Sequence, residues 1–210
     1  MLIEVWSDVV CPWCFIGKRR LDKAVAGLPA GIDVTVVHRA FQLQPDIVET
    51  VPTSQHLSSK YNISPDQVTA MQANVCSIAD GEGLCYDLTD TLSGNTSDAH
   101  RLLLWAGEHG KQSELLEALY SAYFEKKESI FSHDELIRIA QQVGITATDA
   151  KSLLDSDAYS EQVRAEQNQA HQYGANGVPF VVVDGKYGIS GAQAHSGSHV
   201  SQNSPIAYLP

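Results

Sequence analysis

Residues 2–17 read LIEVWSDVVCPWCFIG, and this stretch decides the fold. Its first part, Leu2 to Trp6, is a short apolar run of the kind that forms a buried strand. Cys11 then stands where a helix N-cap is expected, and Pro12 occupies the favoured first position of a helix. The two cysteines of this CPWC motif, Cys11 and Cys14, are therefore predicted at the junction where a strand ends and a helix begins.

The helix that follows the motif has a predicted end and a second strand beyond it. Gly27 and Pro29 are residues that commonly follow a helix C-terminus, so the helix is expected from Pro12 to about Ala26. In the first part of residues 32–41, apolar and polar side chains alternate as they do in a strand. The order strand, helix, strand is typical of an α/β domain.

The composition excludes several functional classes. With 43% apolar and 19% charged residues and no apolar stretch of bilayer length, the chain is expected to be soluble, without a membrane partner. The net charge of −11 repels phosphate backbones, so nucleic acid is not an expected partner. The first residues lack the features of a secretory signal, which predicts a cytoplasmic location. Cysteines in that compartment are more often catalytic, metal-binding or buried than permanently bridged.

The middle of the chain has a helical hydrophobic period. Three segments within residues 58–173 resemble a capping box, the signal with which many helices begin. They are Ser64-Pro65-Asp66-Gln67, Ser132-His133-Asp134-Glu135 and Thr146-Ala147-Thr148-Asp149. We predict an all-helical insertion over residues 58–173.

The strand pattern resumes after the helical part. Phe180 to Val183 form a β-branched run, and Asp184-Gly185 is a dipeptide that two-residue hairpin turns prefer. The predicted fold class is therefore α/β, with one domain built from residues 1–57 and 174–193 and interrupted by the large helical insertion.

The position of the two cysteines makes them chemically unequal. At a helix start, unpaired N–H groups and the helix dipole favour a negative charge, so Cys11 is expected to react as the thiolate. Cys14 falls at the third helical position, on the inward side, and is expected to resolve the mixed disulfide that Cys11 forms. The motif thus predicts thiol–disulfide chemistry that needs no cofactor.

A CxxC motif is also compatible with half a zinc site or with a structural pair. A zinc ribbon needs a second CxxC, whereas Cys76 and Cys85 are separated by eight residues, so no metal is predicted. These two cysteines have two open interpretations. They are either two buried free thiols, or a second, regulatory redox pair that a glycine-containing loop allows to meet.

Several short motifs resemble one known family over residues 1–193. They are Asp8-x-x-Cys11-Pro12-Trp13-Cys14-Phe15-x-Gly17, Phe41-x-Leu43-x-Pro45, Gly83-Leu84-x-Tyr86, Asn95-Thr96-x-x-Ala99-His100-Arg101, Gly177-Val178-Pro179-Phe180 and Gly191-Ala192-Gln193. The chain resembles the cytosolic DsbA-like family often called FrnE-type, which is related to 2-hydroxychromene-2-carboxylate isomerases and kappa-class glutathione transferases. The resemblance implies a thioredoxin-like fold with a helical insertion and dithiol chemistry at the CPWC motif.

The resemblance also implies a cis-proline that faces the active site, and this falls on Pro179. A cis bond there would offer the backbone of Val178 to an extended substrate strand. Pro12 and Trp13 are expected to contact the substrate, and Trp13 is expected to lie exposed between the thiols as an apolar rim, although packing at a subdomain contact is an equally ordinary use of a tryptophan.

Two carboxylates precede the motif closely enough to exchange a proton with Cys14. These are Asp8 and Glu4, and Asp8 is preferred because it belongs to the motif of the family. Surface solvation is the alternative for both. His100 follows a helix start, but a satisfied core or capping histidine is the more common use of such a residue.

The C-terminal residues differ from the family pattern. Residues 194–210 are rich in serine and lack a 3.6-residue period, so an irregular tail is expected in place of a helix that covers one sheet face. A partner chain could cover that face instead, which makes a homodimer possible.

Two other functions remain open from the sequence. One is a glutathione-dependent isomerase or transferase on the same fold, although such enzymes use a hydroxyl residue where this chain has Cys11. If the protein exchanges disulfides, glutathione is a possible co-substrate beside protein or small thiols. The other function is a non-enzymatic binding module or holdase.

Overall fold

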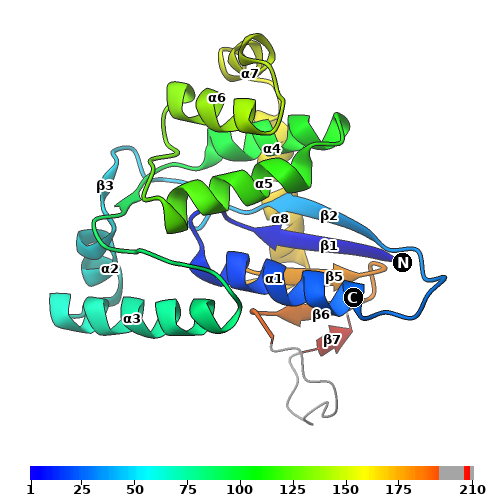
Figure 1. Ribbon diagram of the computed structural model, residues 1–210, viewed down its shortest axis with the longest axis horizontal. Helices are drawn as coiled ribbons and strands as arrows, with labels where there is room; N and C mark the ends of the chain where they lie inside the picture. The colour runs from blue at the N-terminus through cyan, green and yellow to red at the C-terminus, as the bar shows by residue number, and fades with distance from the viewer. Residues whose placement is uncertain (194–205, 209–210) are drawn as a thin grey trace. The chain divides into compact units, whose positions relative to one another are not determined.

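The computed structural model describes residues 1–193 and 206–208 (Figure 1). The chain folds into two compact units. One unit comprises Met1–Leu43 with Gln162–Pro210, and the other comprises Gln44–Glu161. The first unit is a mixed α/β domain made from both ends of the chain, and the second is almost entirely helical, so the predicted fold class is confirmed.

The first unit contains one sheet of five strands in the order β2-β1-β5-β6-β7. The strands are β1 (Leu2–Ser7), β2 (Thr35–Ala40), β5 (Phe180–Val183), β6 (Tyr187–Ser190) and β7 (Ile206–Tyr208). β1 pairs in parallel with β2 and antiparallel with β5, and the remaining neighbours are antiparallel. The predicted strand over residues 32–41 begins only at Thr35, because its partner β1 begins at Leu2, which is paired with Thr35.

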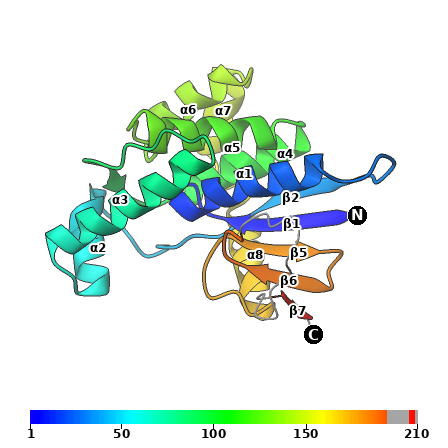
Figure 2. The same cartoon turned by 60° about the horizontal axis from the view of Figure 1, so that its bottom comes forward.

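Two helices cover opposite faces of this sheet (Figure 2). Helix α1 (Pro12–Ala26) has the predicted bounds and lies over the face to which Val5 points. Helix α8 (Ser160–Gln172) lies over the other face, where Trp6 and Ala170 belong to a buried core cluster. The other buried members of that cluster are Phe41, Ala175, Phe180 and Val182. Because side chains alternate along a strand, β1 supplies one core residue to each face in turn.

The units divide at different residues from those predicted. Helix α8 was expected in the insertion, but it packs on the sheet, and its Glu166 carbonyl oxygen accepts a hydrogen bond of 2.8 Å from the Trp6 Nε1. Residues 44–57 were expected with the α/β domain and instead belong to the helical unit. A helical period shows that a helix has an apolar side, but it does not say against which core that side packs.

The hairpin between β5 and β6 has the predicted turn. Asp184 and Gly185 both have positive φ, 49° and 65°, as a type I′ turn requires. The Lys186 N–H closes the turn on the Val183 carbonyl oxygen at 3.0 Å. The Asp184 carboxylate also accepts the Leu2 N–H at 2.7 Å, which ties the turn to the start of β1.

The second unit contains helices and one short two-stranded sheet. Its elements are β3 (Val51–Pro52), α2 (Thr53–Tyr61), α3 (Pro65–Gly81), β4 (Leu92–Ser93), α4 (Ser97–Glu108), α5 (Gln112–Tyr120), a π-helical turn η1 (Ser121–Glu125), α6 (His133–Gln142) and α7 (Ala147–Leu154). The capping boxes predicted at Ser64 and Ser132 are formed, and Thr146 caps α7 through the Asp149 N–H. No helix in the described part of the chain is long and apolar enough to cross a membrane.

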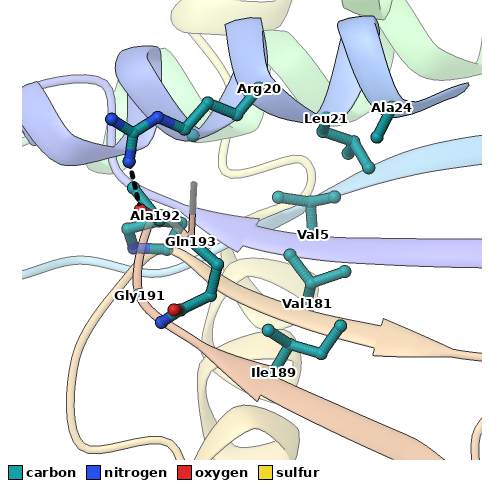
Figure 3. Close-up of a pocket in the computed structure, with 11 residues that line it drawn as sticks. Val5, Arg20, Leu21, Ala24, Val181, Ile189, Gly191, Ala192 and Gln193 are labelled. Atoms are coloured by element: carbon teal, nitrogen blue, oxygen red, sulfur yellow. Dashed lines mark hydrogen bonds between the residues drawn. The ribbon is translucent and has the colours of Figure 1, made fainter. Parts of the chain in front are cut away.

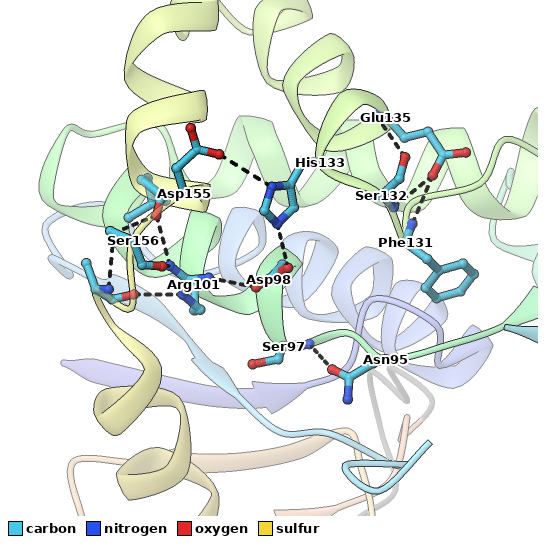
Figure 4. Close-up of polar contacts among 12 residues, drawn as sticks. Asn95, Ser97, Asp98, Arg101, Phe131, Ser132, His133, Glu135, Asp155 and Ser156 are labelled. Carbon is cyan, nitrogen blue, oxygen red and sulfur yellow. Dashed lines mark hydrogen bonds and ion pairs between the residues drawn. The ribbon is translucent and has the colours of Figure 1, made fainter. Parts of the chain in front are cut away.

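A buried arginine holds the end of α7 in this unit (Figure 4). Arg101 on α4 donates to the carbonyl oxygens of Leu153 at 2.9 Å, Ser156, and Ala158 at 2.8 Å. It also donates to Asp98 at 2.7 Å, and Asp98 in turn contacts His133 at 3.0 Å. Arg101 therefore ties the last turn of α7 to the segment that follows it.

The C-terminal part corrects one prediction. Residues 206–208 were expected to be irregular, but they form β7, which is antiparallel to β6. An edge strand offers unpaired N–H and C=O groups to any segment that reaches it, and this needs no 3.6-residue period. The rest of the predicted tail, residues 194–205 and 209–210, lies outside the described residues.

Candidate functional site

The CPWC motif forms the first turn of α1, as predicted. Cys11 is the N-cap residue with an extended backbone, Pro12 is at the first helical position, and the Cys14 N–H donates to the Cys11 carbonyl oxygen at 3.0 Å. The Cys11 N–H donates to the Asp8 carbonyl oxygen at 3.1 Å, which fixes the turn between β1 and α1. Cys11 is 4% exposed and Cys14 is 2% exposed, and both are free thiols.

The environment of Cys14 favours the protonated thiol. Burial raises the pKa of Cys14 well above its ordinary value, and the contact with Cys11 raises it further. A thiol with a raised pKa seldom ionises by itself near neutral pH, so Cys14 is a weak nucleophile until something takes its proton.

Cys11 lies beside the loop that precedes β5. Its Sγ donates to the Val178 carbonyl oxygen at 3.5 Å and makes no capping hydrogen bond to α1. The peptide bond between Val178 and Pro179 is cis. The structure thus brings together Cys11 and Val178, which are 167 residues apart in the sequence.

Helix α1 approaches Pro179 closely at one glycine. A Cβ atom on Gly17 would lie 3.1 Å from the Pro179 Cγ, closer than most such contacts. A side chain at this position would push α1 away from the loop that carries Pro179. Gly17 therefore keeps the CPWC turn against the 178–179 peptide.

Asp8 is the carboxylate closest to the motif. It is 1% exposed, and its Oδ2 accepts the Leu43 N–H at 2.8 Å. A hydrogen bond from the Asp8 backbone lowers the pKa of Cys14, and the negative charge of Asp8 raises it by a smaller effect. Glu4 instead pairs with Arg39 at 2.7 Å, and Arg39 also pairs with Glu166 of α8. Of the two predicted carboxylates, only Asp8 interacts with Cys14.

The α1 face of the sheet carries an apolar groove of about 290 Å³ (Figure 3). Val5, Val181 and Ile189 form a row across three neighbouring strands, and Leu21 and Ala24 of α1 lie opposite them. Arg20 closes one end by donating to the Ala192 carbonyl oxygen at 2.6 Å. Pro179 and Gly17 line the same groove, so it extends from the site along α1.

Trp13 is half-buried on α1, and not exposed as predicted. Three further predicted residues, Cys76, Cys85 and His100, lie in the helical unit. Cys76 is half-buried on α3, where burial raises its pKa, and Cys85 is exposed in the loop after α3. Both are free thiols. His100 is 2% exposed on α4, next to the structural Arg101. Among the described residues, no group of three or more His, Cys, Asp or Glu side chains is arranged to hold a metal ion.

Comparison with known proteins assigns the family. Residues 2–198 match the DSBA-like thioredoxin domain, and the chain belongs to this family. A crystal structure of a probable DsbA oxidoreductase from Streptomyces coelicolor is 41% identical, with a TM-score of 0.89 over 92% of this chain and 85% of that one. An uncharacterized protein of Bacillus subtilis, YwbO, is 26% identical over 81% of this chain and 80% of its own length.

A more distant likeness concerns the fold alone. A 2-hydroxychromene-2-carboxylate isomerase structure is 13% identical, with a TM-score of 0.65 over 91% of this chain and 89% of that chain. The match to the family model and the Streptomyces relative confirm the DsbA-like family and the fold class that the sequence suggests.

Three features of the site were not apparent from the sequence. They are the Leu43 N–H that binds Asp8, the close approach of Gly17 to Pro179, and the apolar groove. The motifs around Leu43 and Gly17 marked these segments. The contact of the Leu43 N–H with Asp8 and the contact of Gly17 with Pro179, however, join segments that are far apart in the sequence. The hydrophobic period of a sequence does not show which distant segments meet.

Proposed function

We propose that this protein exchanges dithiols and disulfides with protein or small-molecule substrates through Cys11 and Cys14. One observation carries the proposal: two thiols share the first turn of a helix, and burial keeps the inner thiol protonated while the outer thiol lies against the Val178 backbone. The family and the DsbA-like relative support an oxidoreductase of this type.

The reaction has two steps in the reducing direction. Cys11, as the thiolate, attacks one sulfur of a substrate disulfide, so that a Cys11–substrate disulfide forms and the other substrate sulfur leaves as a thiolate. Cys14 then loses its proton, and its thiolate attacks the Cys11 sulfur. The Cys11–Cys14 disulfide forms, the substrate sulfur leaves as a thiolate, and two electrons pass from the cysteine pair to the substrate.

Asp8 is the proton acceptor that we assign to the second step. It is a buried carboxylate whose charge acts on Cys14, and its Oδ2 is already held by the Leu43 N–H. In the oxidising direction the same proton returns from Asp8 to Cys14 as the Cys11–Cys14 disulfide opens. The reaction therefore balances without a cofactor or a metal ion.

The substrate is expected to bind along the backbone of Val178. Its carbonyl oxygen is the partner of Cys11 in the free protein, and an extended peptide beside the mixed disulfide would use the same backbone groups. Pro12 and Trp13 are half-buried beside Cys11 and supply apolar contact area. Glutathione is a possible small co-substrate. A cytoplasmic location and a homodimer remain predictions from the sequence.

Single cysteine variants test the proposal. Cys11→Ser should abolish exchange with a dye-labelled disulfide, and Cys14→Ala should accumulate a mixed disulfide that mass spectrometry detects. Cys85→Ser is the matched control, because it removes an exposed thiol from the helical unit and should leave exchange unchanged. Full exchange activity in Cys11→Ser would overturn the proposal.

The same proteins address the alternatives left open by the sequence. Glutathione-dependent isomerisation by Cys11→Ser, with no disulfide exchange by the unchanged protein, would favour the isomerase. Binding of unfolded chains that survives Cys11→Ser without any exchange would favour a holdase. The second redox pair is tested by the mass of the oxidised protein, because a Cys76–Cys85 disulfide predicts a two-hydrogen loss that Cys76→Ser removes.

A further inference from the structure

The segment that follows β2 connects helix α8 to the site. The Phe41 N–H donates to the Ser7 carbonyl oxygen at 3.2 Å, and two residues later the Leu43 N–H donates to Asp8. This segment is therefore hydrogen-bonded to the end of β1 on one side. On its other side it meets two consecutive side chains of α8, Glu166 and Gln167.

Gln167 binds both polar groups of one residue's backbone. Its Oε1 accepts the Gln42 N–H at 3.0 Å, and its Nε2 donates to the Gln42 carbonyl oxygen at 3.3 Å. A side-chain amide carries one acceptor and two donors, so it can hold a backbone N–H and C=O at the same time. Glu166 adds a hydrogen bond of 2.7 Å from the Ala40 N–H.

These contacts determine where the next N–H points. With both polar groups of Gln42 engaged by α8, the following N–H, that of Leu43, is directed at the Asp8 carboxylate. The Leu43 side chain packs against the core cluster around Trp6, which fixes the same residue from its apolar side. Hydrogen bonds to a charged acceptor are stronger than neutral ones and depend on geometry.

We infer that Gln167 is a positioning residue for the second step of exchange: it holds the Gln42 backbone so that the Leu43 N–H keeps the Asp8 carboxylate in place. This inference rests on the proposed function, and in particular on Asp8 as the proton acceptor. The two hydrogen bonds of the Gln167 amide go to Gln42 and not to either thiol, so Gln167 acts through Leu43 and Asp8.

The test separates the two steps of the reaction. The assay uses protein that carries Cys76→Ser and Cys85→Ser, because these free thiols would also react with the reagent. Dithiobis(nitrobenzoate), an aromatic disulfide, then releases one coloured thiolate when Cys11 attacks and a second when Cys14 resolves the mixed disulfide. Gln167→Met keeps the length of the side chain and removes both hydrogen bonds to Gln42. We expect the first release to keep its rate and the second to slow about three- to tenfold, the range that a lost hydrogen bond produces.

Gln169→Met is the matched control. It makes the same substitution on α8 and removes the hydrogen bond of 3.2 Å between Gln169 and the Tyr173 hydroxyl, which does not lead to Asp8. Both rates should stay unchanged in this variant. If Gln167→Met does not fold, Gln167→Glu takes its place, because it keeps the acceptor for the Gln42 N–H and removes only the donor.

Asp8→Asn distinguishes the possible failures. It should slow the second release, and Gln167→Met should then add no further slowing in that background, because the two residues act through one another. If Asp8→Asn slows the second release but Gln167→Met does not, the inference is wrong and the proposed function stands. If Asp8→Asn leaves the second release unchanged, Asp8 is not the proton acceptor and the inference falls with that assignment, while exchange through Cys11 and Cys14 is still decided by the cysteine variants. Independent, additive slowing by the two changes would also overturn the inference.

Discussion

At the scale of single residues, the chemistry of the site depends on titratable side chains whose burial disfavours their charged form. Cys14 shows this directly, because desolvation is the largest cause of its raised pKa. A second buried titratable group lies on the sheet face that α1 covers. His38 on β2 is aligned with Val5 on β1 and is 8% exposed.

His38 predicts a pH dependence of stability. Burial, with a smaller effect of the Lys18 charge, lowers the pKa of His38 from 6.5 to about 4. As the pH falls below 6.5, the unfolded chain takes up a proton that the folded protein excludes, so the free energy of unfolding decreases between pH 6.5 and about 4. The loss should be on the order of 3 kcal/mol at most.

Urea denaturation at a series of pH values would measure this loss. His38→Gln removes the titrating group, and the part of the slope between pH 6.5 and about 4 should disappear with it. His109 is an exposed histidine on the surface of the helical unit. His109→Gln should leave the slope unchanged. An unchanged slope in His38→Gln would show that other groups cause the acid sensitivity.

Single residues also show what the sequence could reveal about the site. Cys11, Cys14 and Asp8 were identifiable because the motif fixes them within one turn of each other. Lys18 is a charged residue of α1, and it is nevertheless buried and pairs with Asp22 at 2.9 Å. A long side chain can lay its apolar stem along the protein while its charged end finds a local partner, and residue type does not report that choice.

At the scale of elements, one arginine links three parts of the helical unit. Arg101 on α4 supplies donors to carbonyl groups at the end of α7 and in the segment that leads to α8. Since those carbonyl groups lie at a helix end, they have no partners within α7. The motif that includes Arg101 therefore has a structural role here.

Arg101→Met should destabilise the helical unit. The change keeps much of the apolar stem and removes every donor, so the hydrogen bonds to three carbonyl groups and the ion pair with Asp98 are lost inside the unit. We expect a loss of roughly 2–4 kcal/mol in the free energy of unfolding. The matched control is Arg138→Met on α6, because Arg138 is 48% exposed and pairs only with Glu128 among the described residues. That variant should change stability by less than about 1 kcal/mol.

The measurement is chemical denaturation followed by the helical circular dichroism signal. Arg101→Lys provides a graded comparison, since lysine keeps the charge but not the planar set of five donors. It should fall between the unchanged protein and Arg101→Met. Equal stability of Arg101→Met and Arg138→Met would contradict the role that we assign to Arg101.

Elements were predicted well where local signals define them. The bounds of α1, the capping boxes of α3 and α6 and the turn at Asp184 all follow from residues a few positions apart. The assignment of α8 to the insertion was wrong because a helix that packs on the sheet and a helix that packs in the helical unit have the same apolar period. Strand β7 was missed because three residues at a sheet edge give no pattern of their own.

At the scale of the whole molecule, the sequence indicated that both ends of the chain build one α/β domain and that the middle is helical. The change from strand to helical period and back carried that prediction. The boundaries at Leu43 and Gln162 could not be read, because they depend on which residues contact each other in three dimensions. The same limit applies to the hydrogen bond between Leu43 and Asp8.

The pairing of β1 with β5 has a consequence during synthesis on the ribosome. Phe180, where β5 begins, emerges 140 residues after Ala40, the last residue of β2. Synthesis adds about 5–20 residues per second, so roughly 7–28 seconds pass between the synthesis of β2 and that of β5, the strand that pairs with β1. Throughout that interval the newly made CPWC turn has no Val178 beside it, so a chaperone or a thiol reductant that protects emerging cysteines would have its longest opportunity there.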